Sequence, residues 1–307
     1  MRKSRIYPNG ELGKEGVLRV LVAGASGYLG RFIAEELKAR GHWIRVLVRD
    51  ADALKVPGRY LAPAIHGLVD EIFVGDVTKP NTLEHVCQNI DVLISALGIT
   101  RQSGASHMDV DYQGNKNLLH LALQASVRKF IYVHVFNASI LQFLENVQAK
   151  QKFVDDLQGS GMAHTVLCPT GFFSDMTEFL QMAKKGRVYL IGDGISRINP
   201  IHGADLAKVC VDAIACDVEE LSVGGPVTYT YQQIAETAFS AVKRPPVIWH
   251  LPMGMIRTAV SLLYPFSRRL YGIGRGLIAL MQIDSVAPES GTHTLAQYYE
   301  QILSAEF

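Results

Sequence analysis

Three glycines stand at a spacing that suits phosphate binding: Gly24, Gly27 and Gly30 follow directly on the apolar run 17–23. The run predicts a β-strand, and the periodicity of residues 28–40 predicts a helix after it. Glycines let the backbone turn tightly and approach a pyrophosphate, while free N–H groups and the helix dipole face its negative charge. Flanked in this way, the motif predicts a nicotinamide dinucleotide site. The residues expected to contact the cofactor here are Gly24, Ser26, Gly27, Tyr28, Leu29 and Gly30.

The charge at the end of the second predicted strand bears on which dinucleotide binds. About twenty residues beyond the glycines, strand 44–48 is followed by Arg49. An acid there would hold the ribose hydroxyls of NAD, whereas an arginine favours the 2′-phosphate of NADP. Arg31 adds a second basic side chain near the glycines, although Asp50 follows Arg49 directly. We predict NADP, with NAD as the alternative; in the other interpretation Arg49 is a solvated surface residue.

Two further strand ends carry residues suited to the same ligand. Asp76 and Val77 follow strand 71–74; an aspartate there either accepts a hydrogen bond from the adenine amino group or caps the next segment. Strand 92–95 is followed by Ala96, Leu97 and Gly98, where the backbone is expected to run close to the cofactor. Asn115, on the following predicted helix, is either structural or a ligand.

Composition restricts the class of protein. The chain of 307 residues has a net charge of +1, and 48% of its residues are hydrophobic and 19% are charged. This composition is typical of an ordered globular chain, and the low net charge gives no electrostatic attraction to nucleic acid. The four cysteines form no CxxC pair, so we interpret them as reduced packing residues of a cytoplasmic protein. His202 and Asp205 have no further spaced ligands, and we predict no metal site. The apolar stretches are too short to predict a membrane span.

The pattern of elements predicts an α/β fold. Short β-branched runs alternate with helical segments from residue 17 to about residue 168, as in a Rossmann-type doubly wound parallel sheet. We expect a flexible N-terminal extension (1–16), an NAD(P)-binding Rossmann domain (17–170) and a smaller, mostly helical substrate lobe (171–307), partly interleaved with the Rossmann core. The strands expected are 18–23, 44–48, 71–74, 92–95, 130–135, 164–167, 187–191, 223–229 and 247–251. The helices expected are 28–40, 80–89, 108–126, 140–159, 172–185 and 203–216, and from Pro252 to the end we expect a mostly helical chain that closes with 295–304.

Several of these motifs together resemble the atypical short-chain dehydrogenases, and most of all their NmrA-like, NAD(P)H-binding subgroup. The resemblance extends over nearly the whole chain from Val17 and rests on the segments 24–30, 48–50, 75–77, 132–138, 169–173 and 197–207. It implies that the turn formed by Pro169, Thr170, Gly171 and Phe172 lies against the nicotinamide. The family includes reductases, redox-sensing regulators and assembly factors, so the resemblance does not identify one activity.

The usual catalytic pair of short-chain dehydrogenases is incomplete in this chain. Those enzymes use Tyr-x-x-x-Lys, in which the tyrosine exchanges a proton with the carbinol oxygen. Lys150 matches the lysine of the resembling subgroup, but Asn146 stands four residues before it, and His134 occupies a strand end where serine is common. Three interpretations stay open: Lys150 acts alone as acid or orienting group, His134 serves as acid or base, or no chemistry occurs. Lys152 is a rival to Lys150.

We therefore predict a reductase that transfers hydride from NADPH to an unidentified carbonyl or activated alkene. Lys150 is the predicted catalytic residue and a cofactor contact. The alternative is a non-catalytic NAD(P)H-binding redox sensor or assembly factor, associated in one version with a membrane complex.

The region 243–283 is basic and apolar. It contains six lysines and arginines and no acid, interleaved with large apolar residues. Such a segment can lie on an anionic membrane or bind a partner protein. The alternative is a helix pair of the substrate lobe whose arginines face water or an anionic substrate; its glycines and Pro252 interrupt any long continuous helix.

Overall fold

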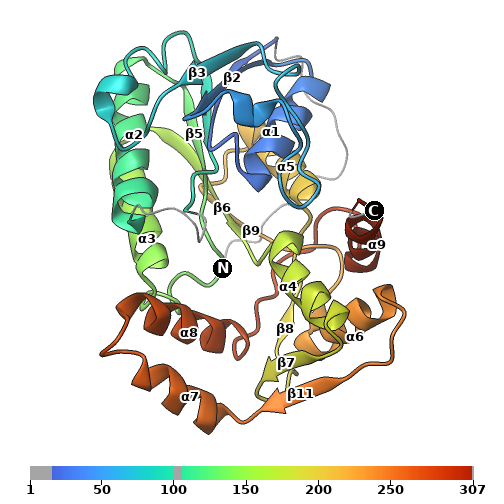
Figure 1. The fold of residues 1–307 in the computed structure, drawn as a ribbon. Helices are drawn as coiled ribbons and strands as arrows, with labels where there is room; N and C mark the ends of the chain where they lie inside the picture. The colour runs from blue at the N-terminus through green and yellow to red at the C-terminus, as the bar shows by residue number, and fades with distance from the viewer. Residues whose placement is uncertain (1–15, 100–105, 306–307) are drawn as a thin grey trace.

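The computed structural model describes residues 16–99 and 106–305. Its first layer is a parallel sheet of seven strands (Figure 1). Their order is β3-β2-β1-β4-β5-β6-β9, and every neighbouring pair is parallel. The strands are β1 (Arg19–Ala23), β2 (Trp43–Val48), β3 (Glu71–Val74), β4 (Val92–Ser95), β5 (Lys129–Val133), β6 (Ala163–Pro169) and β9 (Glu220–Val223). Between β1 and β4 the strand order reverses, which is where ligands bind in such sheets.

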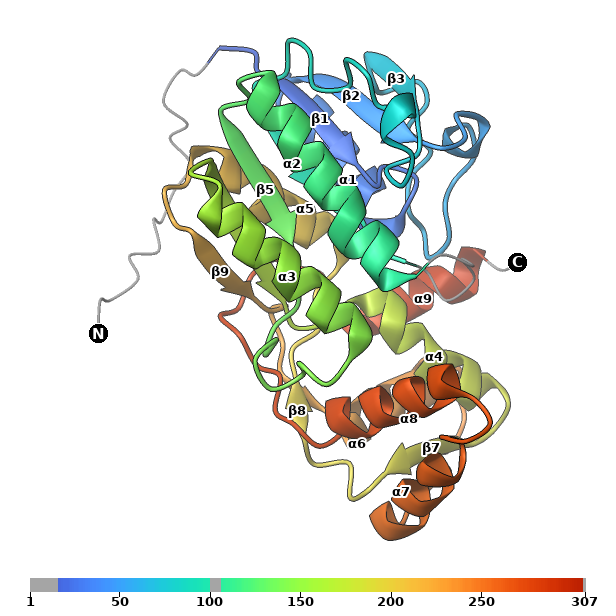
Figure 2. The same cartoon turned by 90° about the vertical axis from the view of Figure 1, so that its left-hand side faces the viewer.

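Helices cover both faces of this sheet because its strands are apolar on both sides (Figure 2). In β1, Val20 and Val22 join one hydrophobic core while Leu21 and Ala23 join the other. The first core includes α1 (Tyr28–Ala39) and α5 (Gly203–Asp212); the second includes α2 (Asn115–Gln124) and α3 (Glu145–Gly159). This confirms the predicted doubly wound Rossmann-type fold.

The second lobe has its own hydrophobic core. It contains α4 (Phe173–Lys184), α6 (Tyr231–Ala241) and α9 (Leu295–Ala305), with β7 (Val188–Ile191) paired in parallel to β11 (Ile248–Leu251). A short antiparallel pair joins β8 (Arg197–Ile198) to β10 (Tyr229–Thr230). The hairpin of α7 (Met253–Leu262) and α8 (Arg268–Leu280) lies at its outer end, with α8 near the start of α3 (Figures 1 and 2).

The two lobes are interleaved through residues 199–225. The chain leaves the first layer after β6, forms α4, β7 and β8, and returns with α5 and β9 before entering the second lobe again. Asn199 lies at this crossing, fully buried, and its side chain bonds the backbone of Ala287 twice and the carbonyl of Gly225 once. Segments far apart in the sequence are therefore held by one side chain.

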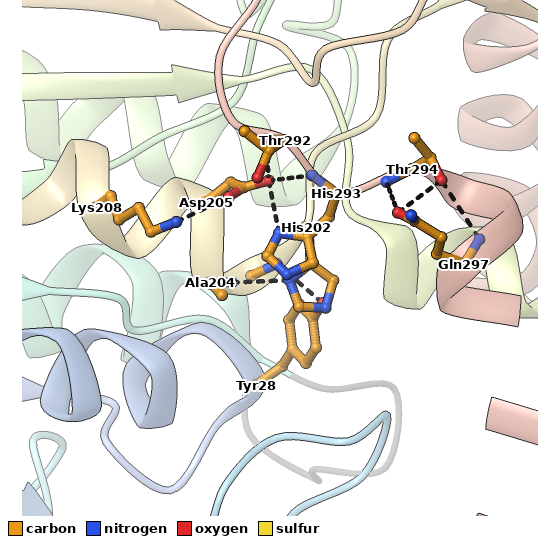
Figure 3. A network of polar contacts seen from close by, with 10 residues as sticks. Tyr28, His202, Ala204, Asp205, Lys208, Thr292, His293, Thr294 and Gln297 are labelled. Atoms are coloured by element: carbon orange, nitrogen blue, oxygen red, sulfur yellow. Dashed lines mark hydrogen bonds and ion pairs between the residues drawn. The ribbon is translucent and has the colours of Figure 1, made fainter. Parts of the chain in front are cut away.

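Asp205 fastens the C-terminal segment to the first layer (Figure 3). Its buried carboxylate accepts the backbone N–H groups of Thr292 and His293 at 2.9 Å each and lies 2.9 Å from Nδ1 of the His293 ring. Burial opposes the charged form, but these hydrogen bonds outweigh it and keep the pKa of Asp205 below its ordinary value. The His293 ring in turn stacks on His202 at 4.3 Å between centroids. Helix α9 follows directly, so its position depends on this carboxylate.

The structure corrects several predicted elements. Residues 80–89 form no helix beyond a short 3₁₀ turn (Pro80–Thr82), because His85 and Asn89 adopt positive φ and the carbonyls of Val86 and Gln88 accept the buried Arg45 guanidinium instead. The predicted helix 140–159 begins only at Glu145. The first part of predicted helix 108–126 is a π-helix over 108–114.

In the second lobe, one prediction was also wrong and one helix was not predicted. Strand 223–229 does not exist as one element, because β9 ends at Val223 and β10 begins at Tyr229. Between them Gly225 packs so closely against the Pro200 carbonyl that no side chain fits there. Helix α6, capped by Thr230 and Gln233, was not predicted. The predicted extension 1–16 lies almost wholly outside the described residues.

Candidate functional site

The glycine turn is built by close backbone contact. Gly24 has a φ of +84°, and a Cβ there would lie 2.7 Å from the Ala96 carbonyl oxygen at the end of β4. A Cβ on Gly30 would collide with the Gly24 carbonyl, and the Gly27 N–H donates to that same oxygen at 3.0 Å. Gly27 caps α1 without a side-chain acceptor, so no side chain caps the N–H groups of the first helical turn. This is the cradle that a pyrophosphate needs.

Among the other predicted contacts in this turn, only Ser26 is exposed. Leu29 belongs to the core and offers only its backbone. The Tyr28 ring leaves the turn: its hydroxyl accepts the Gly203 N–H at 3.0 Å, and its ring meets Phe172 edge-on at 6.0 Å. Burial raises the pKa of Tyr28 far above its ordinary value, so the phenol stays protonated. The Tyr28 side chain therefore contacts α5 and the turn after β6. Only its backbone N–H is left to meet a phosphate.

Arg31 does not supply the second cofactor charge that the sequence suggested. Its side chain is buried, and its guanidinium donates to the carbonyls of Ser26, Ala53, Val56 and Pro63. All of these contacts lie within the protein and hold the loop 50–65 against α1. Arg31 is therefore a structural clamp.

Arg49, by contrast, is exposed at the end of β2, with no hydrogen bond or ion pair to the described residues. Asp76, at the end of β3, binds the Thr78 N–H at 3.0 Å and its hydroxyl at 2.8 Å. Burial opposes the charged form of Asp76, but the Thr78 bonds and the charges of Lys79 and Arg49 lower its pKa. Val77 packs against Gly114 and its carbonyl accepts from Asn117. Arg49 and Lys79 are thus both exposed basic groups near Asp76 at this end of the sheet.

Lys150 lies where two strands end. Its Nζ donates to the carbonyls of Leu97, just after β4, and Val133, the last residue of β5, at 3.2 Å each. The side chain is only 11% exposed. Lys152 stands two residues further along α3. It is exposed, and its Nζ lies 4.4 Å from the centre of the Tyr112 ring. Of the two rival lysines, Lys150 is the one beside the predicted contacts Ala96, Leu97 and Gly98.

A carboxylate outside the predicted contacts stands next to Lys150. Asp111 is 1% exposed; its Oδ1 lies 3.7 Å from the Lys150 Nζ, and its Oδ2 lies 2.7 Å from Nδ1 of His107. A Cβ on Gly98 would sit 3.9 Å from the same Oδ1. The π-helix 108–114 carries Asp111, and no sequence signal marks such a helix. His107 is partly exposed, so Lys150, Asp111 and His107 form a series towards solvent.

Buried polar atoms without a hydrogen-bond partner gather around this lysine. Within the described residues they include Asp111 Oδ1, the Tyr132 hydroxyl and Nδ1 of His134. Lys150 Nζ lies 5.2 Å from the centre of the Tyr132 ring. Because buried polar groups are rarely left unpaired, such atoms mark a place that a ligand or water serves.

His134 is placed close to Lys150 but is poorly suited to donate a proton. Burial, and then the charge of Lys150, lower its pKa to about 4. The imidazole is therefore neutral at pH 7, with Nε2 3.2 Å from Gln151 Oε1. Asn115 also has a structural position: it is fully buried, bonded to Ser95 and to the Asp111 carbonyl.

The turn after β6 is held by the second lobe. The Thr170 hydroxyl donates to the Asn199 carbonyl at 2.6 Å, and the Gly171 carbonyl accepts from Ile201. Pro169 is buried at the strand end, while the half-buried Phe172 packs against Tyr28. Contact of this turn with the nicotinamide stays a prediction.

Other features of the described residues limit which further sites the protein can hold. A cavity of about 620 Å³ lies at the amino ends of the strands, lined by Leu18, Val92 and Lys129 among others, and so on the opposite edge from the glycine turn. The four cysteines are free. Across residues 16–99 and 106–305, no three His, Cys, Asp or Glu side chains are grouped to hold a metal. No helix in the same residues combines the length and apolar character needed to cross a membrane.

Comparison with known proteins supports the predicted cofactor class. Residues 24–217 match a family model described as NAD(P)H-binding. The chain is 26% identical to a divinyl chlorophyllide a 8-vinyl-reductase, chloroplastic, from Cucumis sativus, over 93% of this chain and 76% of that protein. It is also 26% identical to the photosystem II assembly factor Ycf39 of a Synechocystis strain, over 65% of this chain and 59% of that protein.

A solved structure shows the same fold. The NADPH-dependent quinone oxidoreductase QOR2 of Escherichia coli, crystallised with NADPH, superposes with a TM-score of 0.71 at 16% identity, covering 92% of this chain and 99% of that chain.

The depressed histidine pKa values predict a pH dependence of stability. Burial, followed by the neighbouring charges of Lys150 at His134 and of His293 at His202, lowers both folded pKa values to about 4, below the ordinary 6.5. Between these pH values the unfolded chain binds more protons, so the free energy of unfolding falls as the pH drops from 6.5 towards 4. Each imidazole contributes a slope of up to about 1.4 kcal/mol per pH unit.

Urea unfolding between pH 7 and pH 4.5 measures this slope. His134→Phe should make it shallower, while His85→Gln, at an exposed position, serves as the matched control. An unchanged slope in His134→Phe would contradict the assignment of a neutral, buried His134.

Proposed function

The chain belongs to the NAD(P)H-binding family matched over residues 24–217, and on this basis we propose that it is an NADPH-dependent reductase acting on a carbonyl or an activated alkene. The observation that carries the proposal is the position of Lys150, a nearly buried amine anchored to the ends of β4 and β5 beside a buried carboxylate. A reductase needs such a group to supply the proton that accompanies the hydride.

The residues present fit the cofactor. The crowded glycines Gly24 and Gly30 leave the backbone open to a pyrophosphate, and the uncapped N-terminus of α1 faces it. Arg49 is free to bind a 2′-phosphate, which supports NADPH over NADH. The remaining predicted contacts are Asp76, Val77, Ala96, Leu97, Gly98, Lys150 and the turn Pro169 to Phe172.

When bound, NADPH supplies the hydride of the reaction. The reduced product also needs a proton, and Lys150 Nζ holds one at the strand ends. Asp111 then returns a proton to Lys150. Its Oδ1 lies 3.7 Å from Lys150 Nζ, and its Oδ2 lies 2.7 Å from Nδ1 of His107. Because His107 is partly exposed, solvent returns the proton to this series. This arrangement replaces the absent tyrosine, at whose position Asn146 stands one turn before Lys150.

A second candidate is an NAD(P)H-binding assembly factor that docks on a membrane surface. Exposed apolar side chains favour it: along the α7–α8 hairpin, Phe266 is 86% exposed, Leu262 65% and Met255 64%. Isolated apolar residues are ordinary, but a cluster of this size beside a basic segment suits an anionic bilayer. The relative named as a photosystem II assembly factor supports such a role. A cytoplasmic location stays a prediction.

The cofactor preference is tested at Arg49. Arg49→Ala should raise the Kd of NADPH by about 10- to 150-fold, since a charged hydrogen bond contributes roughly 1.5–3 kcal/mol. The Kd of NADH should change little, and titration calorimetry measures both. Arg128→Ala, at the amino end of the sheet, is the matched control. Equal losses for both cofactors would show that Arg49 does not bind the 2′-phosphate.

The reductase itself is tested at Lys150. Turnover of NADPH is followed against a panel of quinones, aldehydes and conjugated alkenes. Lys150→Met should lower kcat by about 10²- to 10⁴-fold for any substrate found, because it removes the proton donor. The exposed Lys152→Met is the control. If NADPH binds yet no rate depends on Lys150, the reductase proposal fails and the second candidate stands.

Membrane docking has its own measurement. The wild-type chain should float with vesicles containing anionic lipid, and Phe266→Ser combined with Leu262→Ser should reduce the floated fraction several-fold. Val56→Ser, at an exposed apolar position in the other lobe, is the control. Failure of the wild-type chain to float with these vesicles would exclude this role.

A further inference from the structure

A second cavity lies away from the glycine turn, between the hairpin and the first layer. It measures about 400 Å³ and is lined by α7, α8 and Phe143, the residue two positions before α3. Val260, Tyr271 and Ile278 contribute to its walls. This volume lies within the range of small-molecule sites.

Two guanidinium groups line the cavity and no carboxylate does. The Arg275 guanidinium lies 4.4 Å from the centre of the Phe143 ring and 5.6 Å from that of Tyr271. Arg257 donates to Gln282 Oε1 at 3.2 Å. Both arginines are exposed, and neither forms an ion pair with a described residue, so the cavity wall carries two positive charges without a counter-charge from the described residues.

The nearest acid in sequence is already committed elsewhere. Between Glu236 and Asp284 the chain contains no acidic residue. Asp284 binds the Arg197 guanidinium at 2.7 and 2.9 Å and the Arg197 N–H at 2.8 Å. The cavity therefore offers positive charge and no carboxylate to an anionic ligand.

The cavity is close to the predicted reaction site. A Cβ on Gly276 of α8 would lie 3.3 Å from the Leu144 side chain, so the hairpin packs on the start of α3. Lys150 follows six residues later on that helix, about 9 Å along its axis at 1.5 Å per residue. Figures 1 and 2 show α8 beside this end of α3. A single extended molecule could span the distance.

We propose that this cavity binds the carboxylate-bearing end of an extended, apolar substrate whose reducible group lies near Lys150. Arg257 and Arg275 take the carboxylate, and the Phe143 and Tyr271 rings contact the apolar body. A guanidinium matches a carboxylate in shape as well as in charge. As a statement about substrate, the inference rests on the proposed reductase function; as a binding site, it stands separately.

The test uses 1-pyrenebutyrate and its uncharged counterpart 1-pyrenebutanol, whose fluorescence reports binding to the full chain. Pyrenebutyrate should bind at least 10-fold more tightly than the alcohol. Arg275→Gln and Arg257→Gln should each reduce that preference several-fold, with Arg128→Gln as the control at a distant surface. NADPH binding, measured in the same samples, reports that each variant is folded.

Each outcome bears on one proposal. Absence of pyrenebutyrate binding, equal binding of acid and alcohol, or a preference that both Arg variants retain would overturn the carboxylate site. If the preference follows the arginines but the quinone, aldehyde and alkene panel shows no turnover, the site stands and the reductase fails. If neutral substrates are reduced but pyrenebutyrate does not bind, the reductase stands and the carboxylate site fails.

Discussion

Backbone crowding at the end of β4 is the constraint on which the site depends. The β1–α1 turn approaches this strand end so closely that Gly24 touches the Ala96 carbonyl, and only glycine fits there. The next carbonyl, that of Leu97, accepts the Lys150 amine. One strand end therefore sets the distance between the phosphate cradle and the proton-bearing side chain. Any widening of the turn would move both parts of the site.

The interleaved path of the chain gives this site a firm second wall. Asn199 and Asp205 are both buried, and each bonds backbone groups nearly ninety residues away. Their hydrogen bonds are inside the protein, where an unmet donor is costly. The second lobe is thus joined to the Rossmann layer by several crossings and not by one hinge.

Charge is divided among the arginines by their surroundings. The Arg31 guanidinium donates to backbone carbonyls, whereas Arg49 is exposed and has no hydrogen bond to a described residue. Arg257 and Arg275 face a cavity that lacks carboxylates. These differences come from neighbouring segments and not from the residue type. The two anion sites proposed above, one at the cofactor end of the sheet and one at the hairpin, both depend on such differences.

The amino-acid sequence alone determined the parallel sheet, the glycine turn and the cofactor class, because β-branched runs and glycine spacing are local signals. It also singled out Lys150 and the missing tyrosine. Only the tertiary structure decided that Arg31 is a clamp, that Asp111 lies beside Lys150, and that residues 80–89 are not helical. Those outcomes depend on partners brought from distant segments, such as the Arg45 guanidinium that takes the carbonyls of Val86 and Gln88. Local pattern does not specify such partners, because packing between distant segments chooses them.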